Sequence, residues 1–208
     1  MRRQACRWGA CGAGSPSPSS GSRRARPGDG RILLAYFSRP GENYWYGGRK
    51  NLRVGNTEVL ARMISAQLKC DVHREAVDRY PADYDEMVER NVREQDADAR
   101  PAIADPLPSI DGYDTVLLAS PIWNVRAPMI MTTFAETYDF SDKTVHPVTT
   151  HAMSGLGTTP EDYARSCRGA RIGTGLAIRG EQARSARADV DAWLRGTGPL
   201  DGRARGGK

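Results

Sequence analysis

The stretch RILLAYFSRPGENYWYGGRKNLRVGNTEVLARMISAQLK, residues 31–69, joins an apolar run to an amphipathic pattern through a long polar and aromatic loop. The run at 31–37 has the length of a buried strand. The segment 57–69 places four apolar residues on one helical face, namely Leu60, Met63, Ile64 and Leu68. A strand followed by such a helix predicts an α/β fold. The loop from Ser38 to Gly55 shows neither periodicity, and loops of this length are usually functional or disordered.

The rest of the chain repeats the alternation of apolar runs and helical patterns. The strand patterns lie at 31–37, 70–77, 114–123, 143–151 and 170–180. The helical patterns lie at 57–69, 83–95, 128–138, about 160–167 and 185–195. This order predicts a small doubly wound domain with a parallel sheet covered on both faces. Pro147 weakens the prediction for 143–151, because proline cannot donate to a strand ladder.

Both ends of the chain have the composition of unfolded segments. Residues 1–30 are mostly Arg, Gly, Ser, Pro and Ala, with almost no aliphatic side chain. Such a segment buries too little apolar surface to offset its ordering entropy, so we expect a disordered basic tail. Residues 198–208 predict a flexible C-terminal tail in the same way. One domain at 31–197 is what remains.

The net charge of +5 comes from the first segment. Six of the 30 Lys and Arg residues, but one of the 25 acidic residues, lie in 1–30, so the remainder of the chain is neutral. A neutral domain does not indicate a specific nucleic-acid-binding face. The tail fits either weak binding to polyanions or a solvated basic segment.

The sequence favours a cytoplasmic protein. The segment MRRQACRWGACGAG carries a twin arginine, but Arg7 interrupts the apolar stretch of about 7–15 residues that an export signal needs. No run approaches the roughly 18 apolar residues of a membrane span. The four cysteines show no CxxC or Cys/His ligand spacing, so they indicate neither a metal site nor a disulfide framework.

Ligands of doubly wound sheets bind outside the carboxyl ends of the strands, so the loops there are the candidate site. In the first loop, Ser38, Asn56 and Thr57 offer small polar groups where a helix begins. A helix N-terminus suits a phosphate, although for this loop taken alone capping of the helix by Asn56 or Thr57 is the simpler explanation. The loop lacks both GxxxxGK[ST] and GxGxxG, which disfavours a P-loop and a dinucleotide site.

Two further loops add groups that suit a planar ligand. Trp123 lies at the end of the third strand, where its ring can pack on a flat heterocycle or serve as a core residue. After the fourth strand, the segment TTHAMSGLGT brings Gly155 and Gly157, which permit close backbone approach or a simple turn. In the same loop Ser154 offers a hydrogen bond to a ring edge, and His151 is either a base or a structural residue.

Three segments of the chain, 32–61, 119–157 and 188–194, resemble the flavodoxin-like proteins. They are most similar to a subgroup whose phosphate loop is lengthened between its serine and its Gly-Asn-Thr. The resemblance implies a three-layer αβα sandwich with a five-stranded parallel sheet in the order 2-1-3-4-5. It also implies one non-covalently bound FMN.

The resemblance assigns roles by position. For the FMN phosphate it implies Ser38, Arg39, Asn56 and Thr57. For the two loops against the flavin ring it implies Pro121, Ile122, Trp123 and Asn124, and then Thr150, His151, Ser154 and Gly155. Tyr44, Trp45 and Tyr46 are then placed to shield the flavin, stack on a substrate or pack on one another. The chain departs from the subgroup at Asn124–Arg126 and at Ala152–Met153, where the subgroup often has an aromatic and glycines.

The expected function is electron transfer through FMN, since the cofactor carries the chemistry and no catalytic triad or metal is needed. The expected partner is either a redox protein or NAD(P)H with a small acceptor. Alternatives are an NAD(P)H-dependent FMN quinone or azo-type reductase, and a flavin-free partner-binding α/β module.

Overall fold

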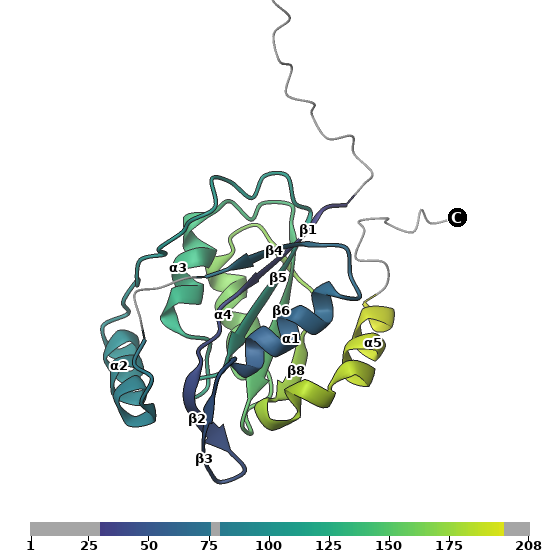
Figure 1. The fold of residues 1–208 in the computed structure, drawn as a ribbon. Coiled ribbons are helices and arrows are strands. Elements are labelled where there is room, and N and C mark those ends of the chain that lie inside the picture. The colour runs from purple at the N-terminus through teal and green to yellow at the C-terminus, as the bar shows by residue number, and fades with distance from the viewer. Residues whose placement is uncertain (1–29, 76–79, 198–208) are drawn as a thin grey trace, which may run out of the picture.

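The computed structural model describes residues 30–75 and 80–197, so the predicted tails lie outside the described residues apart from Gly30. Its centre is a sheet whose neighbouring strands are all parallel. The strands lie in the order β4 (Asp71–Arg74), β1 (Ile32–Tyr36), β5 (Thr115–Pro121), β6 (Thr144–His151), and then β7 (Arg171–Ile172) with β8 (Leu176–Arg179) (Figure 1). With β7 and β8 counted as one interrupted strand, this confirms the predicted α/β fold and the order 2-1-3-4-5.

Pro147 lies inside β6, and the fifth strand is interrupted beside it. On the β5 side, Thr144 donates its N–H to Asp114 O at 2.9 Å. On the other side, Val145 O accepts from Gly173 N at 2.8 Å. Because successive residues of a strand direct their hydrogen bonds to alternate sides, Pro147 faces the break between β7 and β8. Its missing N–H therefore costs the ladder nothing, and the proline does not weaken β6.

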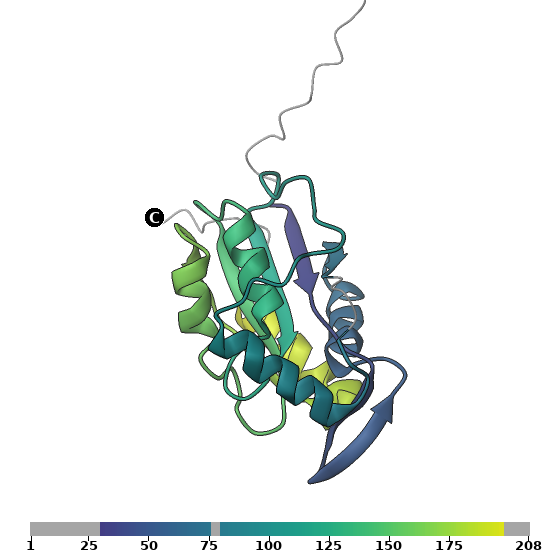
Figure 2. The same ribbon diagram turned by 90° about the vertical axis from the view of Figure 1, so that its left-hand side faces the viewer.

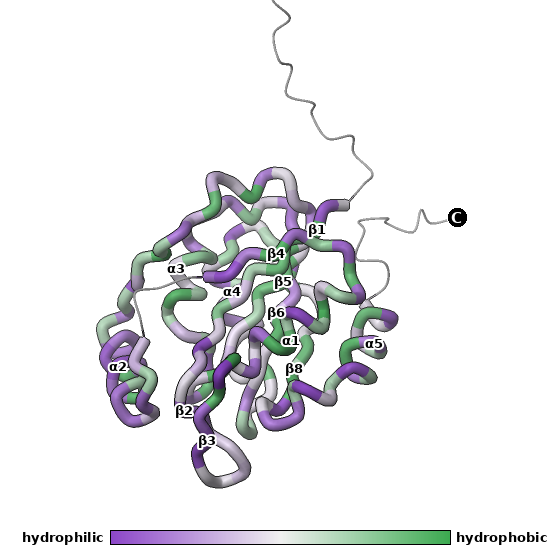
Figure 3. Tube along the Cα trace, viewed as in Figure 1, coloured by the Kyte–Doolittle hydropathy of each residue, from purple (hydrophilic) through white to green (hydrophobic). Residues whose placement is uncertain are grey.

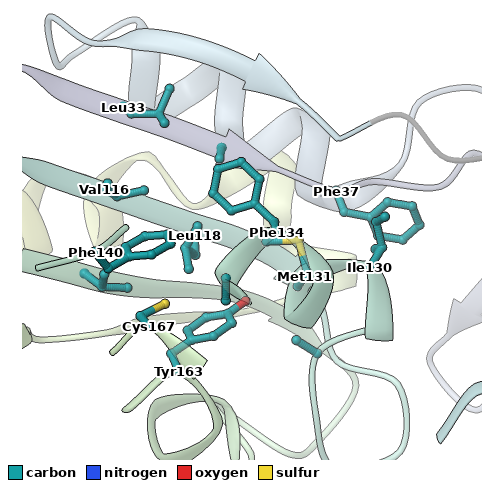
Figure 4. Packing of buried hydrophobic residues seen from close by; sticks show 14 of the residues in the cluster. Leu33, Phe37, Val116, Leu118, Ile130, Met131, Phe134, Phe140, Tyr163 and Cys167 are labelled. Carbon is teal, nitrogen blue, oxygen red and sulfur yellow. The ribbon is translucent and has the colours of Figure 1, made fainter. Parts of the chain in front are cut away.

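Helices cover both faces of the sheet (Figure 2). The helices α1 (Asn56–Ser65) and α5 (Arg187–Gly196), with the 3₁₀ helix η1 (Gly180–Ser185), pack on the face of Leu34 and Leu117. The helices α3 (Met129–Thr137) and α4 (Thr159–Ser166) pack on the face of Leu33 and Leu118. Alternate residues of one strand thus reach opposite cores, as the pleat requires. Figure 4 shows the second core, with Phe134 and Tyr163 near Leu118.

The helix α2 (Tyr84–Asp96) lies beside the carboxyl ends of the strands rather than flat on the sheet (Figure 1). Figure 3 shows it as mostly hydrophilic, whereas the central strands are hydrophobic. Asp83 begins the helix, because its carboxylate accepts the N–H groups of Asp85 and Glu86 at 2.9 and 3.0 Å. Within the described ranges, no helix is long and apolar enough to cross a bilayer.

The loop expected to lack periodic structure forms a β-hairpin instead. Its strands are β2 (Gly41–Trp45) and β3 (Gly48–Leu52), paired antiparallel. Tyr46 and Gly47 connect them with φ values of 46° and 85°, as a two-residue turn with positive φ at both positions requires. The prediction missed the hairpin because β3 is polar and mostly exposed, and β2 combines polar residues with two adjacent aromatics. Neither strand shows an alternation of apolar residues.

Candidate functional site

A cavity of about 510 Å³ lies at the carboxyl edge of the sheet, a typical size for a small-molecule site. Its walls come from the loops after β1, β5 and β6, the hairpin, α2 and the start of η1. Most of the predicted site residues line it, namely Ser38, Arg39, Asn56, Thr57, Pro121, Ile122, Trp123, Asn124, Thr150, His151 and Ser154. Gly155 is not among the lining residues.

One corner of the cavity is the N-terminus of α1. Gly55 precedes the helix and makes no side-chain cap, and neither Asn56 nor Thr57 caps it. Ser38 of the β1 loop serves instead, because its Oγ accepts the N–H of Glu58 at 3.0 Å. Thr57 Oγ1 lies 2.7 Å from Thr150 Oγ1, so the helix start is tied to the end of β6. The structure therefore does not support the simple capping explanation for Asn56 and Thr57.

This corner keeps hydrogen-bond donors for a ligand. Ser38 Oγ acts as an acceptor toward Glu58, so its own O–H proton remains to be donated. The contact between Thr57 and Thr150 uses one of two hydroxyl protons and leaves the other. The first N–H groups of a helix have no acceptor within the helix, and the helix dipole adds positive potential there. Such a set of donors suits an anion.

Arg39 differs from its expected place at an anion. Its side chain is buried, and Nη1 donates to the carbonyls of Pro81 and Ala82 at 2.6 and 3.0 Å. Nη2 donates to the carbonyl of Glu42. The guanidinium thus fastens the hairpin to the segment before α2. Nε alone is buried without a hydrogen-bond partner in the described part of the chain.

Trp123 serves the core as well as the cavity wall. Its ring is 9% exposed and packs edge-on against Phe37 and Tyr80, with centroids 5.5 and 5.1 Å apart. Its backbone N–H donates to Arg126 O at 2.9 Å, which closes the loop, and Asn124 adopts a positive φ of 64° in between. The core explanation therefore accounts for most of this side chain, and its remaining edge lines the cavity.

The loop after β6 is held by hydroxyl groups. Thr149 Oγ1 donates to Gly155 O at 2.9 Å, and Ser154 Oγ donates to Asn124 O at 3.3 Å, which joins the two ring loops. Gly155 has a φ of 61°, so it makes the turn rather than the wall. Burial, with the nearby charge of Arg179, lowers the pKa of His151. Its Nδ1 is buried without a hydrogen-bond partner among the described residues.

Glu181 is a site residue that the sequence prediction missed. It lines the cavity from η1 and is 9% exposed. Oε1 accepts the N–H of Tyr46 at 3.0 Å and so holds the hairpin tip, while Oε2 is buried without a described partner. No local pattern marks this residue, because only the sheet brings η1 next to the hairpin.

Helix α2 forms a further wall of the cavity. The sequence predicted this helix, but not the direction in which its apolar side faces. Tyr84, Val88 and Val92, spaced four apart, all line the cavity, as do Met87 and Asn91. An apolar stripe on a polar helix normally indicates a core-facing side. Here its outer members face the cavity.

The chain matches the family model for flavodoxin over residues 31–196. Among solved structures it is similar to a putative flavoprotein from Bacteroides uniformis, at 26% identity and a TM-score of 0.63, over 80% of this chain and 98% of that one. A putative flavoprotein from Bacteroides eggerthii is similar at 26% identity and a TM-score of 0.64, over 80% and 97%. A flavoprotein from Lactobacillus acidophilus, solved in complex with FMN, shares the fold at 17% identity and a TM-score of 0.54, over 75% and 97%.

No curated protein matches the sequence. The family model nevertheless spans most of the chain, and the sheet order and the loops at its carboxyl edge agree with it. This chain is therefore a member of the flavodoxin family.

Proposed function

We propose that the cavity binds FMN non-covalently and that the protein transfers electrons through it. The observation that carries this proposal is the gathering of the Ser38, Thr57 and Thr150 hydroxyls at the N-terminus of α1, beside two loops at the edge of the sheet. When bound, FMN supplies one- and two-electron redox chemistry, and the protein supplies binding, orientation and electrostatic tuning.

The donor set fits the phosphate of FMN. The O–H of Ser38, one hydroxyl proton of the Thr57–Thr150 pair and the first N–H groups of α1 converge on one corner. Asn56 extends this donor set toward Gly180. Arg39, whose two Nη atoms donate to carbonyls, contributes by holding the hairpin rather than by direct contact with the phosphate.

The other end of the cavity fits a flavin ring. Pro121 to Asn124 form one wall, and the loop after β6, with His151 and Ser154, forms the other. Thr150, near the end of β6, borders the phosphate end instead. Gly155 supports the second wall through its turn. Between ring and phosphate, His151 Nδ1 and Glu181 Oε2 are buried atoms without described partners, which suits them to hydroxyl groups of the sugar-alcohol chain.

A ligand series tests the phosphate assignment. We expect the double variant Ser38→Ala, Thr57→Val to weaken FMN binding at least 30-fold and riboflavin binding less than threefold, because only FMN carries the phosphate. Fluorescence titration of the protein stripped of flavin measures both constants. Equal losses for the two ligands contradict the assignment. A colourless protein that FMN cannot reconstitute supports the flavin-free binding module instead.

The electron donor decides between carrier and reductase. We propose the carrier, which receives electrons from a separate redox protein. Anaerobic bleaching of the flavin band by NADPH alone supports the reductase instead. Bleaching that requires an added flavoprotein reductase supports the carrier.

A further inference from the structure

Helix α2 directs an apolar stripe into the cavity. Val88 and Val92 are 38% and 48% exposed and lie one helical turn apart, and both line the cavity. Tyr84 continues the stripe, with the Arg49 guanidinium 4.7 Å from its ring centroid. Met153, on the loop after β6, also lines the cavity and is 77% exposed. Apolar side chains that are exposed together at a cavity indicate a ligand with an apolar surface.

Asn91 supplies a polar group within this wall. Its side chain is 4% exposed and lines the cavity between the levels of Val88 and Val92. Oδ1 accepts from Gln95 Nε2 at 3.2 Å, and Gln95 Nε2 also lies 3.4 Å from Trp123 O. The acceptor atom of the amide is thus engaged, and its NH₂ group is left as the donor toward the cavity. A buried amide in an apolar wall suits a ligand that carries a carbonyl oxygen.

The charges of the wall favour a neutral ligand. Among the described lining residues, the ionisable groups other than tyrosine and histidine are Arg39 and Glu181. The Nη atoms of Arg39 donate to backbone carbonyls, and Glu181 holds the hairpin tip. The α2 side of the cavity is therefore apolar and amide-lined.

We propose that the α2 wall is the subsite for the electron acceptor, and that this acceptor is a neutral, flat aromatic compound with ring carbonyls, of the quinone class. The ring packs against Val88 and Val92, and one carbonyl accepts from Asn91. This proposal rests on the proposed FMN function, because the subsite adjoins the loop Pro121–Asn124 that forms the ring wall.

The competing explanation is that the stripe only covers the flavin ring itself. The two explanations predict different effects of a negative charge introduced on α2: it weakens binding of the acceptor in the first case and binding of FMN in the second. A carboxylate at position 92 repels an apolar acceptor but leaves the phosphate corner untouched. If the flavin occupies the wall, the same carboxylate weakens FMN binding.

The test titrates menadione into the oxidised, FMN-loaded protein and follows the perturbation of the flavin absorbance bands, without turnover. We expect saturable binding that Val92→Glu weakens at least tenfold, while the FMN dissociation constant stays within twofold. Val72→Glu is the matched control, since Val72 is 50% exposed on β4 and does not line the cavity. We expect Val72→Glu to leave the dissociation constants of menadione and of FMN unchanged.

A carbonyl-free analogue tests the role of Asn91. We expect Asn91→Leu to weaken menadione binding about tenfold and to leave 2-methylnaphthalene binding within twofold, because only menadione accepts a hydrogen bond. Equal losses for both compounds overturn the assignment of Asn91.

These experiments distinguish a failure of the acceptor subsite from a failure of the proposed FMN function. FMN binding without saturable menadione binding, or equal loss of FMN and menadione in Val92→Glu, overturns the acceptor subsite alone. Failure of the unaltered chain to bind FMN overturns the proposed function and, with it, this subsite.

Discussion

Gly55 determines how closely the loop after β1 approaches the start of α1. A Cβ atom at this position would lie 2.3 Å from Ser38 Oγ and 2.5 Å from Arg39 O, well inside van der Waals contact. The Arg39 atom belongs to the backbone, so a side chain at position 55 must displace the loop itself. Glycine here is a steric requirement of the close approach between the loop after β1 and the start of α1.

We therefore expect Gly55→Ala to weaken FMN binding at least tenfold, because the displaced loop moves Ser38 Oγ away from the helix start. Fluorescence titration measures the constant. Gly196→Ala is the control, since a Cβ there meets nothing within 4 Å. An unchanged FMN affinity in Gly55→Ala shows that the loop adapts and that Ser38 is not held by packing.

Glu75 is a buried carboxyl outside the site. Its side chain is fully buried, the imidazole Nε2 of His73 lies 3.4 Å from Oε1, and neither carboxyl oxygen has a hydrogen bond from the described residues. Burial raises the pKa of Glu75 to about 8, and it lowers the pKa of His73. The folded protein therefore holds a neutral carboxyl where the unfolded chain holds a carboxylate.

The sign of the pH effect follows from proton binding. Between the ordinary pKa of 4.5 and about 8, the folded state binds more protons at this group than the unfolded state, so the unfolding free energy falls as pH rises. We expect Glu75→Gln to remove this slope and to be the more stable protein at pH 8, by up to several kcal/mol at ~1.4 kcal/mol per pKa unit. Urea unfolding at pH 5 and pH 8 measures the difference. Parallel pH profiles contradict the assignment.

At the scale of elements, contacts from several parts of the fold hold the hairpin β2–β3 at the cavity. Arg39 joins the Glu42 carbonyl of the hairpin to the carbonyls of Pro81 and Ala82 before α2. Arg49 forms an ion pair with Asp85 of α2 at 2.6 Å, and Glu181 accepts the N–H of Tyr46 at the hairpin tip. The Arg49–Asp85 pair is exposed, so solvent screening leaves it only a small contribution to stability. The bond from Tyr46 to Glu181 is part-buried and is therefore less screened than that ion pair.

We expect Glu181→Ala to raise amide hydrogen exchange across residues 41–52 by at least fivefold, because the Tyr46 N–H loses its acceptor. Hydrogen–deuterium exchange with mass spectrometry reports the segment directly. Glu89→Ala is the control, since Glu89 forms an exposed pair with Arg93 within α2 at 3.7 Å. Unchanged exchange in Glu181→Ala places the fastening at Arg39 instead.

The elements also show why some of the secondary structure could be predicted from the sequence and some could not. Strand β1 was predictable as a continuous apolar run of strand length, and helix α1 was predictable because its apolar residues recur on one helical face. The hairpin was not, since its strands are polar and gain order from Arg39 and Glu181, which lie elsewhere in the fold. Pro147 wrongly weakened the prediction of β6 for a related reason. The missing N–H of this proline is harmless because it faces the break between β7 and β8, which the sequence does not reveal.

At the scale of the molecule, two cores on opposite faces of one sheet support the site. Phe134 is fully buried in the core of α3 and α4, and its ring packs on Tyr138 and Phe140 with centroids 4.8 and 6.2 Å apart. The sheet edge that carries the loops is rigid because both of its faces are filled.

We expect Phe134→Ala to lower the unfolding free energy by about 3–5 kcal/mol, through lost burial and a residual cavity. Denaturant unfolding followed by circular dichroism measures it. Val92→Ala, at a half-exposed position, should change stability by no more than about 0.5 kcal/mol. A loss below 1 kcal/mol in Phe134→Ala shows that the core repacks.

The sequence by itself determined the strands of the central sheet, the helices and the loops where polar and aromatic groups gather, because hydrophobic patterns and loop composition are local. The strand order was implied by the family resemblance, and the hairpin was not predicted. Only the tertiary structure decided which of those polar and aromatic groups line the cavity. It engaged Arg39 with carbonyls, placed Trp123 mainly in the core, and brought Glu181 and the α2 stripe to the cavity. These outcomes depend on distances between segments far apart in the chain, and no local pattern encodes them.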